Sequence, residues 1–480
     1  MNTTLRIARG EWQHLLRTRL AVTVIVMLLG LIVVAAASSA QQLISEAQTR
    51  EAYQREAEET FRSQPARHPH RMVHYGHYVF RTPAPLSVID PGVDPFTGRS
   101  IFLEGHRRNT ATFAEARETS VLTRLGVVSP AFALQVIAPL LLILLGFTSV
   151  VRERERGTML QLIAQGVPAR SLVLGKAAAI GSVAALATLP LLISALWLSM
   201  RYPAETLPAL IVFAAHAAYL GFWVVLITVV STLARSARAA LITLMIVWAV
   251  TTILVPRIAA DAAATLVTSQ TQTEMDILIQ RDMRVVGDSH DINDPGFRSF
   301  QDQVLDEYGV DSINELPVNY RGLVSLQGEA EGSAVMNQYA SELHATQREQ
   351  ARVINLFSVV SPYIAVRNLS MGTAGTDLIN HQRFLDTAET QRFELIQSIN
   401  TLHANEVHFA DDSARSVDHE AEQRTRVSAD FWQRLQGFAF SPRPVGERLA
   451  SALPLILVMA LWLMAAVVLI NRVARKAGEV

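Results

Sequence analysis

The stretch LAVTVIVMLLGLIVVAAA, residues 20–37, decides the fold class of this 480-residue chain. It carries no charged side chain, and a helix of this length reaches across most of a hydrocarbon core that is about 30 Å thick. It is continuously apolar, without the alternation that marks a strand of an outer-membrane barrel, so a helix is predicted. Stretches of the same kind recur, and the predicted spans are residues 20–40, 127–151, 177–200, 207–234, 239–256 and 449–473.

The polar segments between these spans define the predicted domains. We expect an all-α polytopic membrane protein with six transmembrane helices and two mainly helical extracytoplasmic domains, residues 41–126 and 257–448. Residues 1–19 should form a cytoplasmic interfacial helix, residues 152–176 a short cytoplasmic segment, and residues 474–480 a cytoplasmic tail. The predicted spans would contact membrane lipid.

Positive charge in the short loops sets the predicted orientation, because such loops on the cytoplasmic side are enriched in Lys and Arg. With both termini in the cytoplasm, Arg201 is the only basic residue of the short loop on the other side. The cytoplasmic side then collects Arg6, Arg9, Arg17, Arg19, Arg152, Arg154, Arg156, Arg170, Lys176, Arg235, Arg238, Arg472, Arg475 and Lys476. An alternative is that residues 20–37 form a cleaved signal peptide, but the apolar run exceeds the roughly 7–15 residues of a signal core.

Composition excludes several classes of function. The net charge of −1 provides no overall attraction for nucleic acid, so no nucleic-acid partner is expected. The absence of cysteine excludes disulfides and thiolate chemistry. Half of the residues are hydrophobic and 18% are charged, as expected for a membrane core with polar appendages.

Helical periodicity and break signals divide the two outer segments further. Residues 65–105, rich in Pro and Gly, should be irregular, and breaks are expected at residues 288–296 and 361–376. The predicted helices are residues 41–62, 109–125, 259–286, 297–308, 329–357 and 384–436.

The cytoplasmic segment VRERERGTMLQLIAQGVPARSLVLGK, residues 151–176, is the most informative short motif. Thr158 is expected to cap a short helix that Gly166 ends in a left-handed conformation, and Pro168 should start the next helix. The apolar face of the short helix would comprise Met159, Leu162 and Ile163. The prediction is a small rigid knob, and the alternative is a tight loop that carries positive-inside charge.

This segment resembles the motif that follows the second span of type-2 ABC transporter permeases. The matching residues are Glu153 or Glu155, Gly157, Thr158, Leu160, Arg170, Gly175 and Lys176. The resemblance implies a coupling helix that docks on a separate ABC ATPase subunit. The candidate coupling residues are therefore Glu153, Glu155, Gly157, Thr158, Met159, Leu160, Leu162, Ile163 and Arg170. Residues 5–19 similarly resemble the interfacial elbow helix of that family, and an amphipathic basic helix would lie at a membrane surface in any case.

A second resemblance extends over most of the chain. It is carried by residues 74–76, 85–86, 90–93, 103–109, 361–362 and 375–377, with His381 and Phe384. These pieces resemble a subgroup of large bacterial permeases with two outer domains, grouped broadly with the permease of the nitrous oxide reductase copper-maturation system. The resemblance implies a location in the bacterial inner membrane. Six spans per chain suggest a second permease chain in the complex, identical or paralogous. Whether the outer domains bind a periplasmic partner is not decided by this resemblance.

The chain is not expected to hydrolyse ATP or to be an enzyme. It has no Gly-x4-Gly-Lys-Ser/Thr run, and Gly175-Lys176 is followed by Ala177, so it cannot build a phosphate-binding loop. No Gly-x-Ser-x-Gly or His-Glu-x-x-His run points to a hydrolase. The chain itself is expected to bind no cofactor, and ATP and Mg²⁺ would belong to the partner subunit.

Two groups of polar residues remain as candidate sites. His216 is the one ionisable residue deep in a predicted span, and it either contacts cargo along a pathway or forms a hydrogen bond between helices. In the first outer segment, imidazoles that suit copper or zinc fit no closed metal motif. They are therefore either metal ligands or ordinary solvated residues: His68, His70, His74, His77 and His106. Residues 291–296 also weakly resemble a calcium loop, with Pro295 at a ligand position.

Three functions follow from these observations. The first is the membrane subunit of an ABC transporter that moves an unidentified cargo. The second is a mechanotransmitting subunit whose outer helices act on a periplasmic partner, for example in metalloenzyme maturation, without moving cargo across the bilayer. The third is a membrane-anchored enzyme or metal receptor, which depends on the histidines alone.

Overall fold

The computed structural model describes residues 2–111, 128–434 and 437–477. Within them, six helical runs are long and apolar enough to cross a membrane, so the chain is an all-α polytopic membrane protein as predicted. The runs are α2 (Leu20–Arg62), α5 to α7 (Pro130–Glu155), α9 (Ala169–Arg201), η4 and α10 (Pro203–Leu233), α11 to α12 (Ala237–Leu266) and α21 (Val445–Lys476). Helix α1 (Thr3–Arg17) precedes them.

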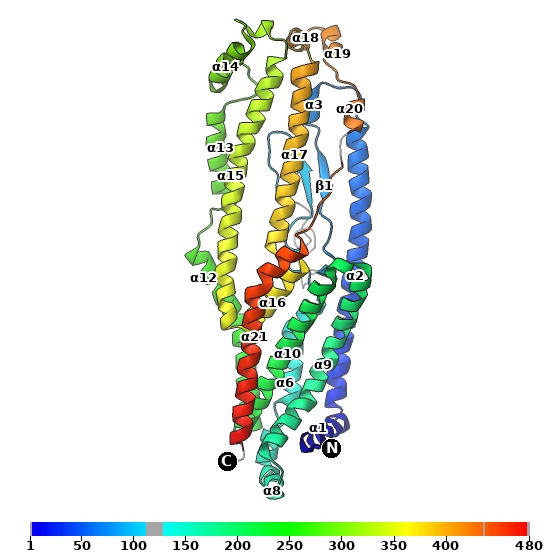
Figure 1. Ribbon diagram of the computed structural model, residues 1–480, viewed down its shortest axis with the longest axis vertical. Helices are drawn as coiled ribbons and strands as arrows, with labels where there is room; N and C mark the ends of the chain where they lie inside the picture. Colours follow the sequence, from blue (N-terminus) through cyan, green and yellow to red (C-terminus); the bar gives the residue numbers. More distant parts are fainter. Residues whose placement is uncertain (1, 112–127, 435–436, 478–480) are drawn as a thin grey trace.

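The molecule is elongated, with the spanning helices at one end and a large helical body at the other (Figure 1). Both marked chain termini lie at the bundle end, and α8 (Thr158–Ala164) lies there too. We call the described parts of residues 41–111 and 267–444 the distal body. The two long polar segments therefore project from the same end of the bundle, opposite α1 and α8.

Helix α2 joins the bundle to the distal body without a break. Its 43 residues span about 65 Å at 1.5 Å per residue, so the predicted first span and the predicted helix 41–62 are one rod. Its bundle half is anchored by Ala21, Val24, Leu28 and Ile32, whose spacing of three to four residues places them on one buried face.

The distal body consists mainly of antiparallel helices. Helix α15 (Tyr320–Leu356) packs on α17 (Leu378–Glu406), and a Cβ on Gly322 would lie only 2.3 Å from the Ala404 backbone nitrogen, so this crossing requires glycine. Further helices of the distal body are α3 (Pro69–Val73), α13 (Gln272–Val286), α14 (Arg298–Tyr308), α18 (Phe409–Ala414), α19 (His419–Arg424) and α20 (Asp430–Gln433).

Several predicted boundaries in the distal body are wrong. The segment expected to be irregular contains an antiparallel pair, β1 (His77–Phe80) and β2 (Ser100–Leu103). Helix α15 begins at residue 320 rather than 329, and α17 ends at 406 rather than 436. The helix expected over 259–286 is interrupted, because Thr271 caps α13 through the backbone N–H of Glu274. The helix expected over 109–125 falls mostly outside the described residues.

The predicted break at residues 361–376 is in fact helix α16 (Pro362–Ala374). Ser361 caps its start, Pro362 occupies its first turn, and Gly375 ends it at a φ of +74°. These residues mark the two boundaries of a helix, and their closeness in the sequence is what makes the segment resemble a continuous break.

The turn before α16 lies between the spanning helices and is hydrogen-bonded to two of them. The Ser361 hydroxyl donates to the carbonyl oxygen of Thr251 at 2.6 Å, and the Trp462 indole donates to the carbonyl oxygen of Ser358 at 3.0 Å. Thr251 and Trp462 lie in the middle parts of their spans. Ala365, Val366 and Leu369 belong to the bundle's hydrophobic core. The distal body is therefore rooted between the spans, and α16 packs on both α10 and α21.

Candidate functional site

Helix α8 forms a knob at the end of the molecule that also holds the termini (Figure 1). It follows α7 (Val151–Glu155), the last turn of the second span. Gly157 and Gly166 bound it at φ values of +72° and +83°, a region that L-residues with a Cβ rarely adopt. The backbone N–H of Val167 donates to the carbonyl oxygen of Leu162 and closes the C-terminus. The predicted short helix with a glycine stop is present.

Thr158 does not cap this helix as predicted. The N-cap residue is Gly157, and the Thr158 hydroxyl instead donates to the carbonyl oxygen of Glu153 at 3.1 Å and to its carboxylate at 2.5 Å. The left-handed turn at Gly157 carries Thr158 into the first helical turn, from which its hydroxyl points back to α7. Thr158 therefore joins α8 to α7.

The apolar residues of α8 divide into an inner and an outer set. Met159 is buried against Leu172 and Val173 of α9 and against Ile470 and Val473 of α21, and Leu162 and Ile163 pack on the same cluster. Leu160 faces away and leaves 66% of its surface exposed. The knob is thus fixed to the ends of two spans and presents one large apolar side chain outward.

A buried charge network holds α7, α9 and α1 together. The Lys176 ammonium lies 2.7 Å from the carboxylate of Glu153 and 2.5 Å from that of Glu11. Arg152 approaches Glu11 at 3.5 Å and the His14 ring at 2.7 Å. Pairing of this kind is required because a buried charge without a partner is costly.

Gly175 lies at the same contact. A Cβ at this position would stand 2.7 Å from the Ile7 side chain. Helix α1 therefore approaches α9 more closely than any larger residue would permit. Gly175 and Lys176 serve the packing of α1 and α7 on α9.

Helix α7 is also tied to the start of the fifth span. Arg154 donates to the carbonyl oxygen of Ala234 at 2.8 Å, and the Glu155 carboxylate accepts from the backbone N–H of Ala237, the first residue of α11, at 2.8 Å. A carboxylate is favourable at this helix end because the N-terminus carries partial positive charge. Arg170 donates to the Asn471 side chain at 3.2 Å and links α9 to α21.

The helix of the second span is interrupted just before α7. One side chain forms hydrogen bonds with the backbone groups that lose their helical partners there. The Ser231 hydroxyl of α10 accepts from the backbone N–H groups of Val150 and Val151 at 3.0 and 3.1 Å, and it donates to the carbonyl oxygen of Phe147 at 2.9 Å. Such side-chain support stabilises an irregular turn inside a membrane helix. The junction of α6 (Ala138–Gly146) and α7 is therefore a defined bend.

His216 is fully buried between spans. One ring nitrogen lies 3.1 Å from the Gln135 side-chain amide and the other 2.8 Å from the carbonyl oxygen of Val212. The Tyr219 hydroxyl donates to the carbonyl oxygen of Gln135 at 2.9 Å. Both ring nitrogens of His216 thus have a partner, an arrangement typical of an imidazole that links helices.

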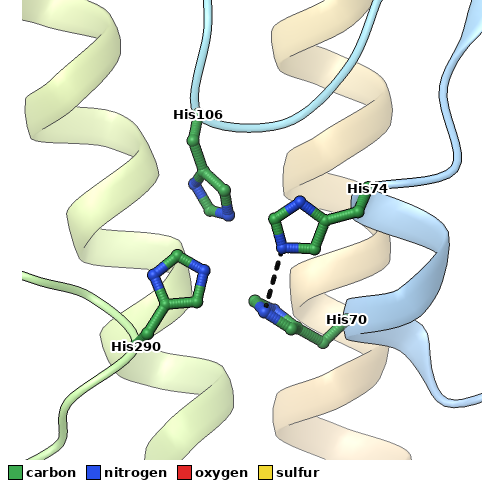
Figure 2. A group of neighbouring side chains, drawn as sticks. All are labelled: His70, His74, His106 and His290. Carbon is green, nitrogen blue, oxygen red and sulfur yellow. Dashed lines mark hydrogen bonds between the residues drawn. The ribbon is translucent and has the colours of Figure 1, made fainter.

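Three of the five candidate histidines meet in the distal body with a residue that the sequence analysis missed. His70 comes from α3 and His74 is the residue that follows its last turn, whereas His106 comes from the loop after β2 and His290 from the loop after α13 (Figure 2). One potential ligand atom from each lies within 4.8 Å of those of the other three. We call these four residues the histidine cluster.

His68 belongs to a different buried group, in which a carboxylate is the acceptor. The Asp412 carboxylate accepts from His68 at 3.1 Å, from His403 at 2.7 Å and from Asn319 at 3.0 Å, and Arg415 lies 3.0 Å away. Burial alone would raise the pKa of Asp412, but the hydrogen bonds from His403 and His68, with smaller electrostatic contributions from the same two rings, lower it well below its usual value. The carboxylate already has four partners, so this group holds the body together.

His77 stands apart from both groups. Its ring packs on that of Phe61, with centroids 4.7 Å apart. Burial, with a smaller contribution from Arg62, lowers the pKa of His77 to about 4. On α17, burial, with a smaller contribution from Arg81, lowers the pKa of His381 to about 3. Both rings are therefore neutral in the folded protein at neutral pH.

These two histidines make the folded distal body sensitive to acid. In the unfolded chain their pKa values return to about 6.5, so between pH 6.5 and the folded values the unfolded state binds more protons. Stability is therefore complete above about pH 6.5 and decreases as the pH falls towards 4, by on the order of 3 kcal/mol for each histidine. We expect His381→Leu to flatten the dependence of the melting temperature on pH between 6.5 and 4. An unchanged slope would contradict the assignment.

His290 could not be assigned from sequence spacing, because it is more than 180 residues away from its partners along the chain, and His403 is equally far from His68 although it lies near Asp412. The only available signal for His290 was its place in a predicted break between helices. The carboxylates of the weak calcium motif accept from the loop's own backbone: Asp291 from Asn293, and Asp294 from Gly296 and Asp288. That loop is a turn that presents His290.

Comparison with known proteins adds one match. A family model described as a domain of unknown function (DUF3526) matches residues 267–441. No curated protein and no solved structure matches the chain. The matched residues run through the distal body from α13 to α20, so they include His290 and exclude α8.

Proposed function

We propose that this chain is the permease subunit of an ABC transporter in a bacterial inner membrane, with both termini and α8 in the cytoplasm. A separate ATPase subunit would bind and hydrolyse ATP with Mg²⁺, and the permease would move a cargo across the bilayer. The proposal depends chiefly on α8, a short helix fixed by two left-handed glycines, rooted on two spans, and exposing Leu160 at the tip of the molecule.

The contacts of α8 and α7 give a route by which a push on the knob reaches the bundle. Met159 bears on α9 and α21, Glu153 reaches α9 and α1 through Lys176, and Glu155 bears on the first turn of α11. Helix α7 itself is the end of the second span. Movement of α8 would therefore displace four spans together, because these contacts are buried, charged or both.

The bundle leaves apolar surface for further partners. In the most apolar stretch of α11 to α12, only 22% is buried within the chain, and the same holds for α21. In the most apolar stretch of α2 the buried share is 28%. Lipid satisfies such surfaces, and so does a second permease chain of the same or a paralogous kind. A transporter with two ATPase subunits would need two such chains.

Co-purification with an ABC ATPase tests the proposal. The chain is expressed together with candidate ABC ATPase subunits from the same genome, extracted in detergent and isolated through a tag on the permease. We expect a stable complex whose ATP hydrolysis rises on reconstitution into lipid vesicles. A chain that purifies without any ATPase, under conditions in which it remains folded, would contradict the proposal.

A second candidate function, mechanotransmission to a periplasmic partner, is favoured by one specific observation. Helix α2 is continuous from the bundle into the distal body, and the turn between α15 and α16 is bonded to two spans at Thr251 and Trp462. Movement of the bundle would thus reach the distal body directly.

Spin labels at two exposed distal positions distinguish the two functions. Tyr53 on α2 and Val285 on α13 are 54% and 81% exposed, so cysteines there should not disturb packing. Mechanotransmission predicts that ATP changes the distance between them in the complex with the ATPase, whether or not cargo is present. A constant distance during ATP turnover would exclude it and leave the transporter.

A further inference from the structure

The histidine cluster brings together four imidazoles from three separate elements. Every pair of ring centroids lies between 4.8 and 6.0 Å apart, and the rings face a common centre (Figure 2). Nε2 of His70 and Nε2 of His74 are 3.2 Å apart and are joined by a hydrogen bond. This separation agrees with the edge of a tetrahedral zinc site, about 3.3 Å for bonds of roughly 2.0–2.1 Å.

Two of the imidazoles are oriented by carboxylates on their outer side. Nδ1 of His106 lies 3.0 Å from the Glu329 carboxylate, and Nδ1 of His290 lies 3.0 Å from the Asp288 carboxylate. A carboxylate at Nδ1 fixes the proton there and leaves Nε2 with a free lone pair, which is the usual arrangement around metal-binding histidines. In His106 that Nε2 is buried and has no hydrogen-bond partner.

The carboxylate behind His106 is itself held rigidly. Glu329 accepts from Arg392 at 2.5 Å and from Ser333 at 3.1 Å, and Arg392 is held by Glu389 at 2.8 Å. His106 also adopts a left-handed backbone with a φ of 64°, a conformation that is uncommon for residues other than glycine. The protein thus uses backbone strain and a buried ion network to aim one imidazole at the centre.

We propose that His70, His74, His106 and His290 bind one late first-row divalent cation, Zn²⁺ or Cu²⁺. Neutral imidazole suits both ions. His74 and His290 are exposed, so ions can enter from solvent. Three ligands come from residues 41–111 and the fourth from residues 267–444, so the ion would clamp the α13–α14 arm to α3 and the β-hairpin. This site does not depend on the proposed transport function.

Metal titration of the full chain tests the site. The protein is purified in detergent through a tag without histidine, stripped with a chelator, and titrated with Zn²⁺ and with Cu²⁺ in competition with a chelating dye. We expect one ion per chain with a dissociation constant of about 1 µM or tighter. In the copper form, electron paramagnetic resonance should show coupling to several imidazole nitrogens.

Three variants make the test specific. His290 lies in an exposed loop, so the His290→Ala variant should fold normally. It should nevertheless bind the ion at least about 100-fold more weakly. Asp288→Asn, which removes the carboxylate behind His290, should weaken it about 10- to 100-fold. His419→Ala is the matched control, because His419 is an exposed histidine of the distal body outside the cluster, and it should leave affinity unchanged.

Hydrogen exchange supplies a readout of the clamp itself. Zn²⁺ should slow amide exchange in residues 287–297 of the unsubstituted protein and leave it unchanged in the His290→Ala variant. Binding weaker than about 1 mM, or equal binding by the unsubstituted protein and His290→Ala, would overturn the proposal. Equal losses in His419→Ala and His290→Ala would do the same, because they would indicate surface binding.

Discussion

Replacing Leu160 by Asp is expected to abolish stimulation of the partner ATPase while leaving the permease folded. Leu160 is 66% exposed, so the chain loses little packing on its own. In a complex the leucine would be buried in the ATPase, and full burial of such a side chain contributes about 1.5–3 kcal/mol. An aspartate would instead bring a charge into that contact. The expected loss of affinity is therefore at least about tenfold to a hundredfold.

The measurement is ATP hydrolysis by the ATPase as a function of permease concentration in lipid vesicles. Val285→Asp is the matched control, because Val285 is an exposed apolar residue in the distal body, and it should leave the titration unchanged. A normal titration with Leu160→Asp would show that the interface lies elsewhere.

The second large effect is expected from Lys176→Met, which removes the cation shared by Glu11 and Glu153. Both carboxylates stay close together and largely buried, with side-chain exposures of 5% and 18%. Breaking a buried pair by deleting one partner costs about 3–5 kcal/mol. We expect a marked fall in the melting temperature of the detergent-solubilised chain, and loss of ATPase coupling, because α1 and α7 lose their common anchor on α9.

A rescue variant separates the charge effect from general damage. The triple variant E11Q/E153Q/K176M carries no stranded charge at this position, so it should regain most of the stability that the single variant loses. Coupling should recover only in part, since the Thr158 hydroxyl can still donate to oxygen atoms of residue 153 but the ionic link to α9 is gone. A triple variant as unstable as the single one would contradict the role assigned to the network.

The sequence predicted best where one physical effect dominates over a long stretch. Residues 20–37 form an uninterrupted apolar run long enough to span a membrane, and Gly166 favours the left-handed conformation that ends a helix, so the spans and the short helix after the second span were predicted. The prediction from sequence failed where contacts between distant segments determine the structure. The segment from Ser361 to Gly375 carries boundary residues at both ends of a helix, and only the surrounding spans show that the helix is buried.

The candidate sites show the same division. The short spacing of His70 and His74 was visible in the sequence, whereas His290 joins them only through the fold of α13 and α15. Likewise, Glu155 is a candidate coupling residue from the sequence, and only the structure shows that its carboxylate accepts from the backbone N–H of Ala237. Spacing along the chain carries no information about such contacts.

Crosslinking from position 160 tests most directly whether α8 receives the movement of an ATPase in the cytoplasm. The chain contains no cysteine, so Leu160→Cys introduces a single thiol at the tip of the knob, and Val285→Cys introduces one in the distal body. In intact cells, a membrane-impermeant thiol reagent should label position 285 and spare position 160. In inverted vesicles, position 160 should crosslink to the ATPase subunit, and ATP should change the yield. Labelling of position 160 from outside the cell, or no crosslink to a nucleotide hydrolase, would contradict the account.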